Sequence, residues 1–198
     1  MRYIIGIDEV GRGALAGPVA VAAVAMPKNL GFKIKNLGKL RDSKKLTPLR
    51  RELWFEYFKN HPQITYSLAR VYPRVIERKN ISKAANTAAL RALTRLCSKK
   101  RINPRKCLIL LDGGLYVGNS GSVPNARTVI KGDERFATVK IASIIAKVSR
   151  DRFMKRLAKK YPRYGFEVHK GYGTKMHFRA IRKHGPSPAH RLTFLRFS

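Results

Sequence analysis

Acidic side chains are scarce in this sequence. Its 198 residues contain 11 Asp and Glu against 43 Lys and Arg, for a formal net charge of +32. So large a positive charge repels itself unless an anionic partner is bound. The basic residues extend from Arg2 to Arg196, so they are spread over the chain and not confined to one terminal tail. Nucleic acid is the leading candidate partner, and an anionic membrane surface is the alternative.

Cysteine and long hydrophobic runs are also scarce. Two cysteines, Cys97 and Cys107, cannot build a disulfide framework, and no Cys-x-x-Cys pair predicts structural zinc. No stretch approaches the ~20 apolar residues of a transmembrane helix, and the apolar run at 3–7 is too short for a signal peptide. We therefore expect a cytoplasmic protein that does not enter membranes. Apolar residues still make up 44% of the chain, enough for one globular core.

The spacing of apolar residues predicts an α/β fold with a mixed sheet. The expected strands, of which the second is antiparallel to the first and the fourth is buried, are 3–7, 18–26, 63–72, 107–111 and 128–130. The expected helices begin at Pro48, at Ser82, at Phe136 and after Thr174. The segments 27–45 and 161–174 are expected to be loops.

Because acids are rare, the position of each one is informative. Glu52, Glu56 and Glu77 fall in charged helical surroundings, which is typical of a solvated helix face. Four other acids follow predicted strands: Asp8, Glu9, Asp112 and Asp133.

The carboxyl ends of neighbouring strands in an open α/β sheet converge on one crevice. Carboxylates gathered there would repel one another unless a cation lay between them. Mg²⁺ prefers such oxygen ligands. An acidic metal site on a protein that attracts polyanions predicts phosphodiester cleavage with two metal ions.

Other functions are also compatible with parts of this sequence. The acids can be turn residues, since Asp112-Gly113 is a common turn dipeptide and Asp133 can cap a helix. The loop 11–17 loosely resembles a dinucleotide-binding fingerprint, but its glycine spacing is wrong and the adjacent acids would repel a pyrophosphate. A non-catalytic RNA-binding protein explains the charge alone, and a nuclease of the same fold acting only on DNA is a third alternative.

Several sequence blocks resemble the bacterial ribonuclease HII family, in family order from about residue 3 to residue 194. The opening block is Gly6-Ile7-Asp8-Glu9-Val10-Gly11-Arg12-Gly13, followed by Ala16-Gly17-Pro18-Val19. The later blocks are Asp42-Ser43-Lys44-Lys45-Leu46-Thr47, Asp112-Gly113, Lys131-Gly132-Asp133, the segment 142–151, Tyr164-Gly165-Phe166, the segment 169–174 and His177.

The resemblance implies a ribonuclease H-like mixed five-stranded sheet flanked by helices, in a catalytic domain over 1–160, with a helical C-terminal subdomain over 161–198. It implies that Asp8, Glu9, Asp112 and Asp133 hold two Mg²⁺ or Mn²⁺ ions. The implied reaction is hydrolysis 5′ to a ribonucleotide, in RNA–DNA hybrids or at single ribonucleotides embedded in duplex DNA. The products would carry 3′-hydroxyl and 5′-phosphate ends.

The resemblance also implies the substrate contacts. Gly11, Arg12 and Gly13 would read the ribose 2′-hydroxyl with backbone groups, because glycines allow close approach. Tyr172 would contact the same hydroxyl and the next sugar. Lys44, Lys45 and Lys147 are expected to contact phosphates, with ordinary exposed lysines as the alternative, and Ser43 is a further expected substrate contact.

A few expectations concern residues outside the proposed site. Asp151 is expected to pair with a nearby Arg, with support of the metal ligands as the alternative, and Asp42 is expected to fix its loop. The histidines show no zinc spacing and are not expected to bind metal: His169, His177, His184 and His190. We also expect a monomer without the extra N-terminal domain of ribonuclease HIII and without a long clamp-binding tail.

Overall fold

The sheet of this protein is mixed, as predicted. The computed structural model describes residues 3–30, 38, 40–41, 43–118 and 123–195. Its five strands lie in the order β3-β2-β1-β4-β5: β1 Tyr3–Val10, β2 Val19–Pro27, β3 Thr65–Val71, β4 Leu108–Asp112 and β5 Ala126–Val129. Strands β1, β2 and β3 pair antiparallel, whereas β4 pairs parallel with both β1 and β5.

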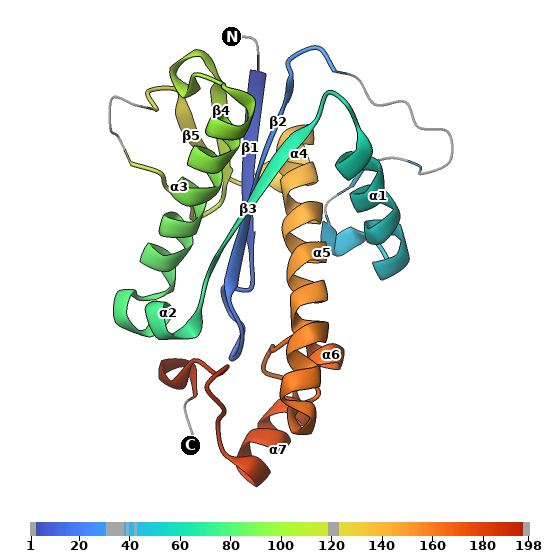
Figure 1. Cartoon of the computed structure of the whole chain (residues 1–198), viewed down its shortest axis with the longest axis vertical. Helices are drawn as coiled ribbons and strands as arrows, with labels where there is room; N and C mark the ends of the chain where they lie inside the picture. Colours follow the sequence, from blue (N-terminus) through green and yellow to red (C-terminus); the bar gives the residue numbers. More distant parts are fainter. Residues whose placement is uncertain (1–2, 31–37, 39, 42, 119–122, 196–198) are drawn as a thin grey trace.

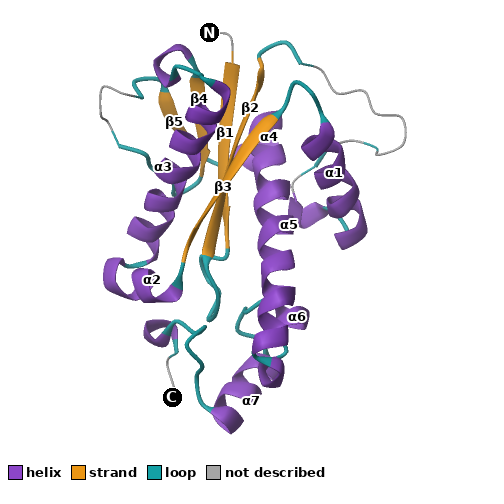
Figure 2. Ribbon diagram, viewed as in Figure 1, coloured by secondary structure: helices purple, strands orange, loops and turns teal. Residues whose placement is uncertain are grey.

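Helices cover both faces of the sheet (Figures 1 and 2). In the figures α3 lies on one side of the strands, and α5 and α1 lie on the other. The helices are α1 Pro48–Asn60, α2 Pro73–Lys79, α3 Ile81–Lys100, α4 Gly132–Arg135, α5 Ala137–Lys160, α6 Phe166–His169 and α7 Lys175–His184. Helices α1, α3, α5 and α7 confirm the prediction to within a residue. The short α2, α4 and α6 were not predicted, because seven residues or fewer show little periodicity.

Strand β2 is a continuous apolar run because both of its faces are covered. Val19, Val21 and Ala23 join the apolar cluster beneath α3, whereas Ala22 and Val24 join the cluster beneath α1 and α5. Successive side chains of a strand point to opposite faces. The burial of β2 therefore assigns one face of the sheet to α3 and the other to α5.

Helix α5 approaches β1 closely at Gly6. A Cβ atom at this position would lie 2.3 Å from the carbonyl carbon of Thr138, in the first turn of α5. Only glycine permits this approach. It brings the start of α5, and the short α4 that precedes it, against the central strand.

A third apolar cluster joins α5 to the C-terminal segment. Met154 and Ala158 of α5 pack with Tyr164, Phe166 and Ile181. The boundary expected at residue 160 coincides with the end of α5, and the division into a domain and a subdomain stays a prediction. Within the ranges described above, no helix combines the length and apolar character needed to cross a membrane.

Candidate active site

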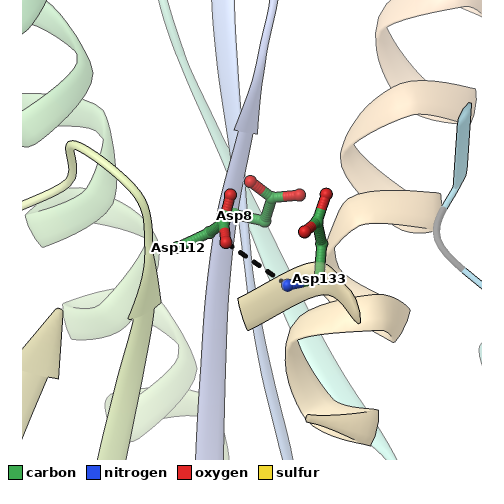
Figure 3. Close-up of side chains that lie close together, drawn as sticks. All are labelled: Asp8, Asp112 and Asp133. Carbon is green, nitrogen blue, oxygen red and sulfur yellow. Dashed lines mark hydrogen bonds between the residues drawn. The ribbon is translucent and has the colours of Figure 1, made fainter. Parts of the chain in front are cut away.

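Three of the four predicted carboxylates meet at one place. Carboxylate oxygens of Asp8, Asp112 and Asp133 all lie within 4.8 Å of one another, and Figure 3 shows the three side chains pointing toward a common point. Residues Ile7 and Leu111 are paired in the sheet and face α3. The next residue on each strand therefore faces α5, which places Asp8 beside Asp112.

Asp133 reaches this point from a helix. The prediction that it ends a strand was wrong, because β5 ends at Val129 and Asp133 lies in the first turn of α4. Its backbone N–H donates to Oδ1 of Asp112 at 3.3 Å (Figure 3). The glycine at 132 makes room for this contact, since a Cβ there would lie 2.7 Å from Val129 and 3.2 Å from the same Asp112 oxygen.

Two of the aspartates, Asp8 and Asp133, bring negative charge into a buried place. Asp8 is 4% exposed and Asp133 is 6% exposed. Burial, reinforced by the charges of Glu9 and Asp112, raises the pKa of Asp8 well above its usual value, although Ser143 donates a hydrogen bond to it. Lys44 Nζ lies 3.6 Å from Asp133, but its side chain is 81% exposed.

The side chain of Glu9 leaves β1 on the face opposite to Asp8, because neighbouring residues of a strand alternate, but its carboxylate is close enough to Asp112 and Lys44 for their charges to act on its pKa. It is not among the residues whose oxygens share the 4.8 Å group. Burial raises the pKa of Glu9 to about 7, with Arg12 opposing this shift and Asp112 adding to it. Its Oε2 is buried without a hydrogen-bond partner in the described structure, and Oε1 lies 3.6 Å from Arg12. The alternation of β1 could have indicated this separation from the sequence.

These residues fit a hard divalent cation. Carboxylate oxygens at this spacing are the ligands that Mg²⁺ and Mn²⁺ prefer. The unpartnered oxygen of Glu9 and the close approach of three carboxylates form an arrangement that a bound cation would stabilise. The site can therefore hold a metal ion on the α5 face, with Glu9 nearby.

The glycine turn, which comprises residues 11–17, directly follows β1. Gly11 has φ of +88°, and a Cβ at this position would lie 2.2 Å from Nε of Arg150. The fold therefore requires glycine at position 11. Gly13 differs, because its φ is not in the left-handed region and an added Cβ would meet no atom within 4 Å. The space in front of Gly13 is open.

Tyr172 belongs to a segment that abuts the glycine turn. The carbonyl of Gly171 accepts hydrogen bonds from Leu15 N at 2.8 Å and Ala16 N at 3.2 Å. The ring of Tyr172 lies 5.3 Å from the guanidinium of Arg150. The two segments predicted to read the ribose are thus neighbours, although 160 residues of sequence lie between Gly11 and Tyr172.

The block that begins at Ser43 flanks the carboxylates. Ser43 is 3% exposed, and its hydroxyl lies 2.8 Å from that of Ser143, which bonds to Asp8. Lys45 pairs with Glu134 at 3.0 Å. Asp42 lies outside the described residues, so its expected role in the loop stays a prediction.

Asp151 was predicted to pair with an Arg, and this was wrong. Its Oδ1 accepts from Lys147 Nζ at 2.9 Å, one helical turn earlier on α5. Lys147 also lies 6.0 Å from the ring centre of Tyr172. A substrate phosphate at Lys147 would share that ammonium with Asp151.

Sequence reasoning missed the supporting roles of Ser143, Arg150 and Arg191. Ser143 and Arg150 lie within a block that matches the family, but their polarity on an apolar helix was not interpreted. Both arginines are completely buried. Arg191 follows His190 in an ordinary basic stretch, and no sequence signal distinguishes it from the exposed arginines.

Solved structures share this architecture. The ribonuclease H2 of Pyrococcus horikoshii OT3 superposes with a TM-score of 0.74 at 27% identity, covering 96% of this chain and 93% of that one. Bst-RNase HIII in complex with Mn²⁺ superposes with a TM-score of 0.72 at 23% identity, covering 96% and 66%. The fold is therefore that of the ribonuclease H-like proteins.

Sequence comparisons identify one family within the ribonuclease H-like proteins. A family model described as Ribonuclease HII matches residues 5–197. A curated ribonuclease HII from Caldicellulosiruptor bescii is 44% identical over 195 residues, which is 98% of this chain and 87% of that protein. The chain belongs to the ribonuclease HII family. It is a hydrolase of the ribonuclease H type, an endoribonuclease of RNA–DNA hybrids.

Proposed function

We propose that this enzyme hydrolyses the phosphodiester 5′ to a ribonucleotide, both in RNA–DNA hybrids and at single ribonucleotides in duplex DNA. The observation that carries the proposal is the convergence of Asp8, Asp112 and Asp133 within 4.8 Å, beside an open glycine turn. The products would be 3′-hydroxyl and 5′-phosphate ends. Such cleavage would begin the excision of ribonucleotides from DNA.

The three aspartates and Glu9 would hold two Mg²⁺ or Mn²⁺ ions. Ions at such a site activate water and stabilise the leaving oxygen. Asp8 would be held in place by Ser143 and by the Glu9 N–H, which donates to Oδ1 at 2.7 Å. Asp112 would be oriented by the N–H of Asp133. These hydrogen bonds would fix the carboxylate oxygens before metal and substrate arrive.

Recognition of the ribonucleotide would fall to the turn at Gly11, Arg12 and Gly13 and to Tyr172. The 2′-hydroxyl is the local chemical mark that distinguishes a ribonucleotide from a deoxynucleotide. Gly13 supports this role, because nothing within the described structure explains glycine there. A methyl group at Gly13 would point into open space that a sugar could otherwise occupy.

The net charge of +32 would attract the polyanionic duplex to a site that is itself acidic. Lys44 lies beside Asp133 and Lys147 lies beside Tyr172, so both could contact phosphates that flank the scissile bond. Lys45 and Ser43 would hold the same loop in position. Neutralisation of several phosphates makes binding strongly dependent on salt.

The test is cleavage of a labelled duplex that contains one ribonucleotide, with an RNA–DNA hybrid and an all-DNA duplex of the same sequence alongside. We expect cleavage of the first two substrates with Mg²⁺ or Mn²⁺ and none in excess EDTA. The upstream fragment should be extended by a polymerase, and the downstream fragment should be ligated without phosphorylation. Cleavage of the all-DNA duplex, or undiminished cleavage in EDTA, would contradict the proposal.

A further inference from the structure

Two arginines near the glycine turn are buried in an unusual way. Arg150 and Arg191 are both 0% exposed, and within the described parts of the chain neither forms an ion pair. Their guanidinium groups donate to backbone carbonyls instead. Burial of a charge without a counterion is costly, and the hydrogen bonds to backbone carbonyls offset part of that cost. Burial, followed by the charge of Arg150, lowers the pKa of Arg191 to about 9.

Arg191 bonds to the two ends of the glycine turn. Its Nη2 donates to the carbonyls of Gly11 at 2.7 Å and Gly17 at 2.9 Å, and its Nε donates to Gly17 at 3.0 Å. Its Nη1 donates to the carbonyl of Arg12 at 2.8 Å. The backbone is also joined here, because Arg191 N donates to Leu15 O at 2.7 Å. The guanidinium therefore determines which way the peptide groups of the turn face.

The planarity of the peptide group means that the hydrogen bonds of Arg191 to the carbonyls also fix the direction of the neighbouring N–H groups. In a planar trans peptide, the C=O of one residue and the N–H of the next point in opposite directions. Because Arg191 draws the carbonyls of Gly11 and Arg12 inward, the N–H groups of Arg12 and Gly13 point away from it. Within the described residues, these two N–H groups have no protein acceptor. Both are therefore available to a ligand in the open space before Gly13.

His190, the residue before Arg191, supports Tyr172 through hydrogen bonds that pass by way of His177. Ser187 N donates to His190 Nδ1 at 2.9 Å, so the proton of His190 is on Nε2. This nitrogen lies 3.1 Å from His177 Nε2, and His177 Nδ1 lies 2.9 Å from the carbonyl of Tyr172. His190 and Arg191 are adjacent in the sequence and thus hold the two parts of the surface proposed to contact the ribose, which are Tyr172 and the glycine turn.

We propose that Arg191 is a positioning residue for ribonucleotide selectivity: it aims the Arg12 and Gly13 N–H groups at the 2′-hydroxyl. The inference rests on the proposed function, since it concerns how that same site distinguishes ribose from deoxyribose. A residue with this role should matter for ribonucleotide substrates and not for general attraction to a duplex. A purely structural residue would affect both alike, through loss of folded protein.

Arg191→Lys and Arg191→Met test the inference. The lysine variant keeps the charge but loses the fork of donors, whereas the methionine variant fills the cavity but leaves the carbonyls of Gly11, Arg12 and Gly17 without these donors. Circular dichroism checks that each variant is folded. Two quantities are measured: kcat/KM for a duplex with one ribonucleotide, and the inhibition constant of the all-DNA duplex as a competitor. We expect kcat/KM to fall by about tenfold to a hundredfold, as for a catalytic geometry misplaced by about 1 Å, with the inhibition constant unchanged.

Leu96→Ala is the matched control. Leu96 is fully buried in α3, away from the proposed site, so this variant loses stability without changing the turn. It should keep both measured quantities. Equal losses in kcat/KM for Leu96→Ala and the Arg191 variants would overturn the inference, as would wild-type kcat/KM in a folded Arg191 variant. Weaker inhibition by the all-DNA duplex in the Arg191 variants would also overturn it.

Failure of the proposed function would look different. In that case the unmodified enzyme itself would not cleave the ribonucleotide duplex in preference to the all-DNA duplex. A further measurement on the unmodified protein follows the amide signals of Arg12 and Gly13 by NMR. They should shift with the ribonucleotide duplex and stay in place with the all-DNA duplex, and equal shifts with both would contradict the inference.

Discussion

The acidic site and the basic cluster are both built from buried or half-buried ionisable side chains, but only the basic cluster has complete side-chain hydrogen bonding in the described structure. The acidic site comprises Asp8, Glu9, Asp112 and Asp133. The basic cluster comprises Arg150, Arg191, His169, His177 and His190, all of them 8% exposed or less. In the cluster, each side chain bonds to backbone carbonyls, backbone N–H groups or a neighbouring histidine.

Hydrogen bonding in the acidic site is less complete. The oxygens of its aspartates face one another, and Glu9 Oε2 has no hydrogen-bond partner in the described structure. Buried polar groups in folded proteins are normally satisfied, so an unpartnered carboxylate oxygen beside three converging carboxylates indicates a place for a ligand. Burial alone therefore does not identify a functional site. The incomplete hydrogen bonding of the acids points to an external partner, whereas the complete bonding of the basic cluster indicates support.

The largest expected effect comes from removing one charge of the acidic site. Asp112→Asn should abolish cleavage while the fold is kept, because the amide has the same shape but attracts a cation poorly. Groups that merely support metal ligands typically contribute about 10–100-fold to activity, so the loss of a ligand should exceed about 100-fold. Activity is measured on the ribonucleotide duplex, and folding is checked by circular dichroism.

A readout independent of activity sharpens this prediction. A metal that binds only the folded protein raises the midpoint of thermal unfolding, so Mg²⁺ or Mn²⁺ should stabilise the wild-type protein more than Asp112→Asn. Glu52→Gln is the control, since Glu52 pairs with Arg152 on the surface. It should retain both activity and stabilisation by metal. Equal stabilisation of wild type and Asp112→Asn would show that Asp112 is not a ligand.

A smaller effect is expected from Gly13→Ala. Because Gly13 is outside the left-handed region and an added Cβ meets no protein atom, the variant should keep its stability or gain about 0.4–1 kcal/mol. Cleavage of the ribonucleotide duplex should fall by about tenfold to 10²-fold, because the methyl group displaces the reacting sugar. Rates are compared with the midpoints of thermal unfolding.

Gly11→Ala provides the contrast on the same turn. Its Cβ would overlap Arg150, so this variant should lose stability as well as activity. The pair separates a glycine required by the fold from one required by the substrate. Full activity in Gly13→Ala would remove the main support for recognition of the 2′-hydroxyl by this turn.

The sequence predicts β1, β2 and β4 well because these strands are largely apolar, whereas β3 and β5 mix polar and apolar residues. The four longer helices were predictable from their caps and apolar periodicity. The carboxylates were found because acids are rare in this chain. Their strand positions were less accurate: Asp8 and Glu9 lie inside β1, and Asp133 lies on α4.

The basic cluster could not be predicted in the same way. Its hydrogen bonds join residues as far apart as Gly11 and Arg191, and they use backbone carbonyls, which carry no residue type. Only tertiary structure shows that Arg191 is buried while most other arginines are exposed. The partner of Asp151 is a different case, because Lys147 lies four residues earlier on α5 and that spacing is readable from the sequence.

The smallest expected effect is a pH dependence of stability from the histidines of the basic cluster. Burial lowers the pKa of His177 from 6.5 to about 4. The unfolded chain therefore binds a proton between pH 6.5 and 4 that the native protein does not bind. Stability should be fully present above pH 6.5 and should fall as the pH decreases through this range. Protonation would place N–H against N–H between His177 and His190.

The measurement is the unfolding midpoint of wild type minus that of His177→Asn across this range. The asparagine amide can still donate to the Tyr172 carbonyl but does not titrate. Glu9, whose pKa is raised from 4.5 to about 7, acts with the opposite sign in an overlapping range, and its contribution cancels in the difference. Each kcal/mol corresponds to about 2–4 °C for a domain of this size. A difference that does not change with pH would show that His177 is not protonated preferentially in the unfolded chain.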